Sequence, residues 1–315
     1  MKCRLCHSDA RRSVPVREMM FGTGESFEYF ECGRCGCVQL ATPPADMSRY
    51  YPAEYHSFAE PPSRIGAWRS ALRRRRNVAV FTGRDLLGGV LAAVYPYPVA
   101  GAANWFRRSS IAPTARVLDV GCGAGLLLRD LAIAGFTNLT GVDPFIAADI
   151  DLPSAGRIRK GTLADISGEF DLIMLHHSLE HIPEQRATLA RIFELLAPGG
   201  WCLIRVPVAS SWAWQHYAAD WVQLDAPRHY FLHSVGSLRA LGEAVGLELD
   251  AVVHDSTELQ FIGSELYRTN RPLSALDSSY TRAERRRFRA RAKQLNAQRR
   301  GDQAAFYFRR PVAPM

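Results

Sequence analysis

A glycine-rich turn joins a short apolar strand to an apolar helix in the segment ARVLDVGCGAGLLL, residues 115–128. The strand pattern covers residues 117–120, Asp119 included, and the helix pattern runs over residues 126–134. Three glycines in G-x-G-x-G spacing form the turn: Gly121, Gly123 and Gly125. This spacing differs from the G-x-G-x-x-G of dinucleotide-binding enzymes, and a tight strand-to-helix turn alone would explain it. The segment predicts a strand–loop–helix unit, the building block of α/β folds.

Strands and helices continue to alternate after this unit. A strand over residues 139–142 ends in Asp143, 24 residues after Asp119. Further strands at Arg157–Thr162, Phe170–Leu175 and Trp201–Val206, and a helix at Glu184–Leu196, are expected. This order predicts an α/β, doubly wound, mostly parallel sheet with helices on both faces. Ligands of such sheets bind where the strand order reverses, at the strand ends that carry both acids, and an acid there can accept both hydroxyls of a ribose.

The segments VLDVGCGAG and GVDP, then FDLIMLHHSLEHIP, LLAPGG and WCLIRVPV, resemble the motifs of class I S-adenosylmethionine-dependent methyltransferases. The resemblance covers residues 111–262 and implies a Rossmann-like sheet of seven strands with S-adenosyl-L-methionine as cofactor. It places Asp119 and the three glycines at the methionine end of the cofactor and Asp143 at the ribose. It also implies that Thr162 and Leu163 flank the adenine.

Two C-x2-C pairs stand near the N-terminus, Cys3 with Cys6 and Cys32 with Cys35. This spacing predicts a small zinc ribbon in which four thiolates hold a structural Zn2+, with strands at 14–17 and 27–31. The alternative is four unrelated buried cysteines. His7 and Cys37 could each replace one of these ligands. Cys122 and Cys202 are expected in the core.

A closer similarity links the chain to zinc-containing sugar C-methyltransferases and to methyltransferases of polysaccharide pathways. It rests on the zinc-binding region, on Y-Y-P-x2-Y at residues 50–55 and on W-x2-L-D-x-P-R-H at residues 221–229. The segment 301–308 resembles the last strand of this group. The expected division is a zinc-ribbon-like module (1–45), a helical cap or linker (46–110) and a methyltransferase domain (111–315) with a basic helical insertion at about 263–302.

The acceptor site is expected at the open end of the fourth strand, because the methyl group must point there. Histidines at this end could remove a proton from the acceptor. The resemblance places histidines and tyrosines of these segments around the substrate. The catalytic candidates are His177, His181 and His229, and the substrate-binding candidates are Tyr51, Tyr55, Glu180 and Arg228; His176 is a further candidate base. Arg228 could hold a phosphate or carboxylate bidentately. The alternatives are that His181 packs against the next helix and that His229 lies in a surface loop.

Charge and hydropathy bear on the partners of the chain. Residues 281–300 contain nine arginines and lysines and one acid, so the net charge of +8 arises from that segment alone. A solvated helix face is the default there, with nucleic acid or an anionic membrane as alternatives. The uncharged run 86–106 contains Pro96, Pro98 and several glycines, which predicts a helical cap that partly touches a membrane surface rather than a span. The N-terminus lacks an apolar signal sequence, so a cytoplasmic chain with reduced thiols is expected.

Three functions are compatible with these patterns. The first is a methyltransferase acting on a small molecule, a saccharide free or linked to a nucleotide or lipid, or a cell-envelope or secondary-metabolite precursor, with contact to the inner membrane face. The second is an RNA methyltransferase with a zinc module, and the third a non-catalytic zinc-ribbon protein on a methyltransferase scaffold. The near-neutral charge outside residues 281–300 disfavours nucleic acid, and the intact glycine loop with both acids disfavours the third function.

Overall fold

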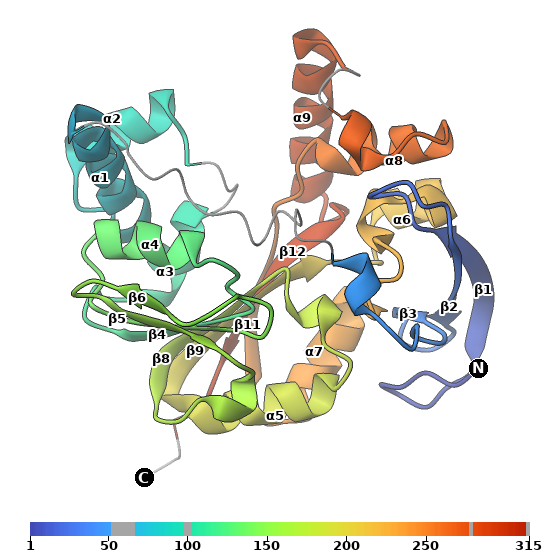
Figure 1. The fold of residues 1–315 in the computed structure, drawn as a ribbon, viewed down its shortest axis with the longest axis horizontal. Coiled ribbons are helices and arrows are strands. Elements are labelled where there is room, and N and C mark those ends of the chain that lie inside the picture. Colours follow the sequence, from blue (N-terminus) through green and yellow to red (C-terminus); the bar gives the residue numbers. More distant parts are fainter. Residues whose placement is uncertain (52–66, 98–101, 277–279, 313–315) are drawn as a thin grey trace.

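The computed structural model describes residues 1–51, 67–97, 102–276 and 280–312. Two sheets organise the described residues, one of eight strands and one of four (Figure 1). The sequence-predicted Tyr55 lies outside the described residues.

The eight-stranded sheet has the order β11-β12-β9-β8-β4-β5-β7-β6. Neighbours from β9 to β7 pair in parallel, whereas β12 pairs antiparallel with β9 and β11, and β6 antiparallel with β7. The strands are β4 (Arg116–Val120), β5 (Asn138–Asp143), β6 (Ile150–Leu152), β7 (Gly156–Lys160), β8 (Phe170–His176), β9 (Leu196–Pro207), β11 (Glu248–His254) and β12 (Gln303–Arg309). The predicted mostly parallel sheet is confirmed, and the short β6 is an eighth strand beyond the seven expected. The strand order changes direction at β4, because β5 and β7 lie on one side of it and β8 and β9 on the other. Ligand-binding residues are therefore expected at the end of this strand.

Helices cover both faces of this sheet, as expected for a doubly wound fold (Figure 1). Leu189 and Leu238, from α5 and α7, pack with Ile173 of β8 on one face. Phe81 and Leu128, from α1 and α4, belong to the core on the other face. The helices are α1 (Ala67–Thr82), α2 (Leu86–Val94), α3 (Ala102–Ser109), α4 (Leu126–Ile133), α5 (Gln185–Leu195) and α7 (Val235–Glu243).

The four-stranded sheet is antiparallel and contains β1 (Ala10–Arg17), β2 (Ser26–Cys32), β3 (Val38–Leu40) and β10 (Phe231–Leu232). The strands expected at 14–17 and 27–31 are therefore present and longer. Because β10 comes from the segment after residue 228, the N-terminal sheet is completed by the second half of the chain. Its core is shared with three later helices, α6 (Trp212–Tyr217), α8 (Leu259–Arg268) and α9 (Arg282–Ala297).

The basic segment forms α9, whose first turn carries a capping box between Thr281 and Glu284. Ala292 and Leu295 are buried in the shared core, so α9 packs on the protein with one face. Residues 198–200 lie in the irregular start of β9, where Gly199 has a φ of 77°.

The apolar run from Leu86 forms α2 and part of α3. Among the described residues, no single helix is long and apolar enough to cross a membrane. The segments Trp68–Thr82 and Leu86–Val94 reach the length and apolarity of a membrane span only when taken together, and the chain bends by 102° between them.

Candidate active site

The glycine turn follows β4 and leads directly into α4. Gly121 and Gly125 both have a φ of 73°, in the left-handed region that favours glycine. A Cβ atom on Gly121 would lie 2.4 Å from the Cβ of Ser178, and one on Gly125 would lie 2.0 Å from Cδ1 of Ile158. Both positions therefore require glycine for conformation and for packing, so part of the motif is explained by the turn itself.

Asp143 at the end of β5 holds this turn in place. Its Oδ2 accepts a hydrogen bond of 2.9 Å from the backbone N–H of Gly123, and its Oδ1 accepts one of 2.8 Å from the N–H of Phe145. A carboxylate offers about four lone-pair sites, so acceptor capacity remains for ligand hydroxyls. The nearby Asp119 is buried, and burial together with the Asp143 carboxylate raises the pKa of Asp119 to about 8.

A cavity of about 680 Å³ opens at this end of the sheet. Its volume is in the range of small-molecule sites. Its lining includes Gly121, Asp143, Phe145, Thr162 and Leu163, and also Tyr51, His177, Ser178, His181 and Glu184. Asp119, Gly123 and Gly125 are not among the lining residues. One cavity thus joins the residues predicted for the cofactor to three of those predicted for the acceptor.

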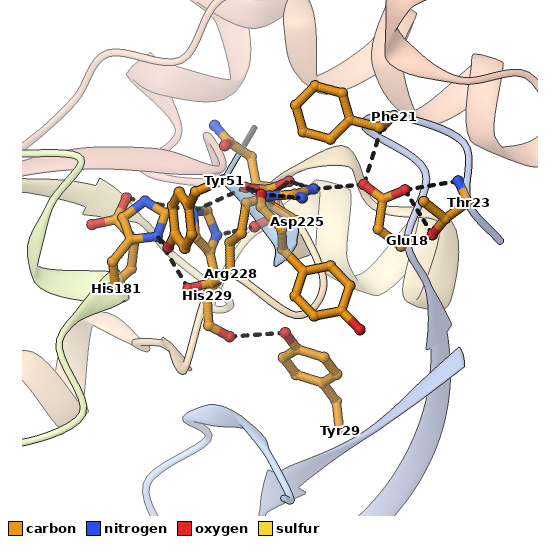
Figure 2. Close-up of polar contacts among 12 residues, drawn as sticks. Glu18, Phe21, Thr23, Tyr29, Tyr51, His181, Asp225, Arg228 and His229 are labelled. Atoms are coloured by element: carbon orange, nitrogen blue, oxygen red, sulfur yellow. Dashed lines mark hydrogen bonds and ion pairs between the residues drawn. The ribbon is translucent and has the colours of Figure 1, made fainter. Parts of the chain in front are cut away.

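His181 lies in the short helix after β8 and faces this cavity. Its Nδ1 is 3.0 Å from the carbonyl oxygen of Arg228 and 3.1 Å from the hydroxyl of Tyr51. Burial lowers the pKa of His181 to about 4, so its ring is neutral at neutral pH. The ring of His229 lies edge-on to it, with ring centroids 4.6 Å apart (Figure 2). His229 is 5% exposed and lies beneath the cavity wall, not in the surface loop of the alternative interpretation.

His177 also lines the cavity, in a backbone conformation with a φ of 52° that is uncommon for residues other than glycine. Its Nε2 accepts a hydrogen bond of 2.8 Å from Arg205, and its Nδ1 is 3.2 Å from Oε1 of Glu180. The ring is therefore fixed by partners on both sides.

The comparisons with known proteins bear on the same region. Residues 98–252 match the family model described as a methyltransferase domain. The sheet around this match is parallel from β9 to β7, with the antiparallel β12 beside β9, as expected for the predicted doubly wound fold. Residues 98–252 thus form a domain with the Rossmann-like methyltransferase fold.

The relatives of the methyltransferase domain are named as small-molecule enzymes. The chain is 32% identical over 108 residues to a ubiquinone biosynthesis O-methyltransferase of Aromatoleum aromaticum, covering 31% of this chain and 46% of that one. It is 32% identical over 143 residues to a trans-aconitate 2-methyltransferase of Deinococcus radiodurans, covering 42% of this chain and 52% of that one. The chain thus spans about half the length of these relatives. An S-adenosylmethionine-dependent methyltransferase from Mesorhizobium loti superimposes with a TM-score of 0.44 at 17% identity, over 67% of this chain and 99% of that one.

Arg228 does not occupy the position expected from the sequence, from which it could hold a phosphate or carboxylate of the substrate. Its side chain is 0% exposed, and it forms ion pairs of 2.8 Å with Glu18 and 2.6 Å with Asp225 (Figure 2). The guanidinium also donates to the backbone carbonyl of Tyr50. Since these partners enclose the group, it is inaccessible to a substrate oxyanion. Arg228 instead ties the methyltransferase domain to the N-terminal sheet and positions His229.

Two other candidates near β8 also lie away from the cavity. Glu180 is 0% exposed and does not line the cavity; burial raises its pKa, but the hydrogen bond from His177 and the nearby histidine rings bring it down to about 2. The expected contact of Glu180 with substrate is therefore not direct. His176 packs against Trp105 with 4.2 Å between ring centroids and both ring nitrogens buried, because alternate residues of a strand face opposite sides.

Tyr51 occupies the predicted place, since its ring stacks on Phe145 at 5.3 Å and its hydroxyl contacts His181. Sequence reasoning missed Phe145, Glu18 and Asp225. The spacing of Asp225 and Arg228 is a local signal for an ion pair. Nothing local links Glu18 to Arg228, because 210 positions separate them.

The four predicted cysteines come together beside β2. One sulfur atom from each of Cys3, Cys6, Cys32 and Cys35 lies within 4.8 Å of the others. The sulfur atoms of Cys3 and Cys35 are 3.7 Å apart, and those of Cys6 and Cys32 are 3.4 Å apart. A tetrahedron with metal–sulfur bonds of about 2.3 Å has edges of roughly 3.8 Å, so the four thiols match a zinc site. His7 and Cys37 are outside this cluster.

Proposed function

We propose that this chain transfers the methyl group of S-adenosyl-L-methionine to a small-molecule acceptor. The observation that carries the proposal is the single cavity shared by Asp143 and the glycine turn with Tyr51, His177 and His181. The cofactor supplies an electrophilic methyl group on a sulfonium. The transfer is an in-line displacement, so the protein has to align the acceptor and take up its proton.

The residues present fit this cofactor. Asp143 has free acceptor capacity for ribose hydroxyls, and Phe145, Thr162 and Leu163 line the same part of the cavity, where an adenine would lie. Asp119 is a buried acid beside the Asp143 carboxylate, and its raised pKa reflects an environment that would favour a nearby cation such as the amino group of the methionine end. Because Asp119 does not line the cavity, it would act on that group from behind the cavity surface.

The acceptor would lie at the other end of the cavity, against Tyr51, His177 and His181. Imidazole side chains and a phenol hydroxyl suit an acceptor that carries hydroxyl groups, so we favour a saccharide, free or linked to a nucleotide or lipid, or a related cell-envelope or secondary-metabolite precursor. His181 has a neutral ring and is the first candidate for the general base. The catalytic roles of His177 and His229, which the resemblance to sugar C-methyltransferases implies, are part of the same proposal.

The contacts of α9 favour a small molecule over RNA. Arg289 forms an ion pair of 2.7 Å with Glu258, Arg291 lies 4.3 Å over the ring of Trp212, and Arg285 donates to the carbonyl of Leu276. Several arginines of the basic segment thus stabilise the packing of α8 and α9 rather than forming a free basic face.

The surface of α1 and α2 favours an acceptor presented on a membrane. Leu86 and Val94 are 92% and 82% exposed, Leu87 and Val90 are also exposed, and arginines lie on the adjoining α1. Apolar side chains next to arginines are typical of contact with an anionic lipid surface.

Transfer of a radioactive methyl group tests the function. The chain is incubated with labelled S-adenosyl-L-methionine and with nucleotide-linked saccharides, lipid-linked saccharides in anionic vesicles, or RNA. We expect label in a saccharide fraction, with turnover highest on vesicles, and none with the Asp143→Ala variant. Label in RNA would contradict the proposed acceptor class, and absence of transfer to every acceptor of a crude cell extract would contradict the activity.

We also propose that the cysteine cluster binds one structural Zn2+ per chain. Replacing Cys32 with serine removes one of four thiolates, so we expect zinc content to fall from about one ion per chain to well below it, with a lower Tm. Elemental analysis of protein purified without added metal measures this. Cys37→Ser is the matched control and should retain zinc; loss of zinc in that control, or full retention in Cys32→Ser, would show that the ligand set is wrong.

A further inference from the structure

A second group of metal-ligand side chains lies at the inner end of the acceptor region. Glu180 and His181 come from the short helix after β8, and His229 from the segment before β10. One ligand atom from each lies within 4.8 Å of the others. His181 reaches the cavity, whereas Glu180 and His229 are buried behind it.

The hydrogen bonds of the two histidines fix which ring nitrogen carries the proton. The Nδ1 of His181 is 3.0 Å from the carbonyl oxygen of Arg228, and the Nδ1 of His229 is 2.7 Å from that of Gln223. A carbonyl oxygen only accepts, so both Nδ1 atoms are protonated and both Nε2 atoms carry a lone pair. Metal-binding histidines show this arrangement, in which a backbone carbonyl orients the ring through its other nitrogen.

Glu180 adds a carboxylate oxygen that needs a partner. Its Oε1 accepts a hydrogen bond from Nδ1 of His177, and Nε2 of His177 accepts one from Arg205. Its Oε2 is buried and has no hydrogen-bond partner among the described residues. A buried carboxylate oxygen without a donor is costly, so this atom points to a missing cation or donor.

The charges around the group leave room for a cation. Three carboxylates lie here, the buried Glu18 and Glu180 and the partly buried Asp225, and Arg228 is the guanidinium paired with Glu18 and Asp225. Oδ2 of Asp225 is 3.8 Å from Nε2 of His229, and Oε1 of Glu180 is 4.0 Å from the same atom. Among these groups, negative charge exceeds positive charge by two, which a divalent ion would balance.

We propose that Glu180, His181 and His229 bind a divalent first-row transition-metal ion. Two imidazoles and one carboxylate are typical ligands of Zn2+, Fe2+, Co2+ or Mn2+. Ligand atoms at about 2.0–2.2 Å from one ion lie roughly 3–4 Å apart. The ligand atoms of the three residues lie within 4.8 Å of one another, so side-chain shifts of about 1 Å would bring them to one ion.

The ion would sit beside His181, the member of the group that lines the cavity, where one open coordination position could face the acceptor. There it would coordinate an acceptor hydroxyl and lower its pKa, so that the proton leaves to solvent. The oxygen then forms a bond to the methyl carbon as the carbon–sulfur bond breaks, which leaves a methyl ether and a neutral thioether. With the ion bound, Nε2 of His181 is a metal ligand, and the ion replaces His181 as the group that activates the acceptor. This catalytic role rests on the proposed function, whereas metal binding itself does not.

Titration with Co2+ tests the site without any methyl donor. The chain is dialysed against a chelator until one zinc per chain remains, and Co2+ uptake is followed by visible absorption. We expect one equivalent of Co2+ with d–d bands of nitrogen and oxygen ligands and no thiolate charge-transfer band. Glu180→Gln and His229→Gln should each weaken binding on the order of 100-fold. His216→Ala, which removes an exposed histidine elsewhere, should bind as the wild type does.

Two outcomes would overturn the proposal. One is a wild-type chain that takes up no Co2+ beyond its cysteine cluster. The other is a Glu180→Gln or His229→Gln variant that retains wild-type affinity. Circular dichroism shows whether each variant is folded, and a variant that does not fold is replaced by His181→Gln. Because no methyl donor is present, failure here is distinguishable from failure of the methyl-transfer proposal.

Discussion

Replacing Arg228 with leucine should lower the free energy of unfolding by about 3–5 kcal/mol. Arg228 and Glu18 are both 0% exposed, and Asp225 is nearly so, so the substitution leaves two buried carboxylates without their cation. Chemical denaturation and Tm measure the change. A loss of this size is a large fraction of the about 5–15 kcal/mol that stabilises a typical domain.

A matched control separates burial from ion pairing. Arg157 forms ion pairs with Asp149 and Asp151 but is 57% exposed, so Arg157→Leu should change stability by only about 0–1 kcal/mol. A combined Glu18→Gln, Asp225→Asn and Arg228→Met variant should recover part of the loss, since no unpaired charge remains. If Arg228→Leu were as stable as Arg157→Leu, the buried ion-pair network would not hold the two sheets together.

The fold was largely predictable because its signals are local. The central strands β4 and β8 are largely apolar runs, and each ends beside a glycine or polar residue that the sequence displays directly. β7 is an exception, because its only large apolar residue is Ile158. The three-residue β6 is too short to give such a signal. The pairing of β10 with β3 joins residues about 190 positions apart, so no local pattern predicts it.

The site was predictable in part for the same reason. Asp143 and the glycine turn follow their strands immediately, and they lie where the sheet topology requires. Arg228 was misassigned because its environment depends on Glu18, which is remote in sequence and becomes a neighbour only when the N-terminal sheet packs against the methyltransferase domain. The exposure of an arginine is a tertiary property that residue type does not reveal.

Replacing Asp143 with alanine should weaken binding of S-adenosyl-L-methionine more than tenfold. The substitution removes the carboxylate that would accept the ribose hydroxyls, worth on the order of 1.5–3 kcal/mol for hydrogen bonds to a charged group. It also removes the acceptor that holds the N–H groups of Gly123 and Phe145, so the turn loses an anchor. Asp151→Ala is the control, because Asp151 is 84% exposed on β6 and does not line the cavity.

Calorimetric titration of S-adenosyl-L-methionine into the wild type, Asp143→Ala and Asp151→Ala tests most directly whether this end of the sheet binds the cofactor. A melting curve for each protein establishes that it is folded. The account predicts binding to one site per chain in the wild type, unchanged affinity in Asp151→Ala and a loss of more than tenfold in Asp143→Ala. Absence of binding to the wild type, or equal affinity in all three folded proteins, would contradict it.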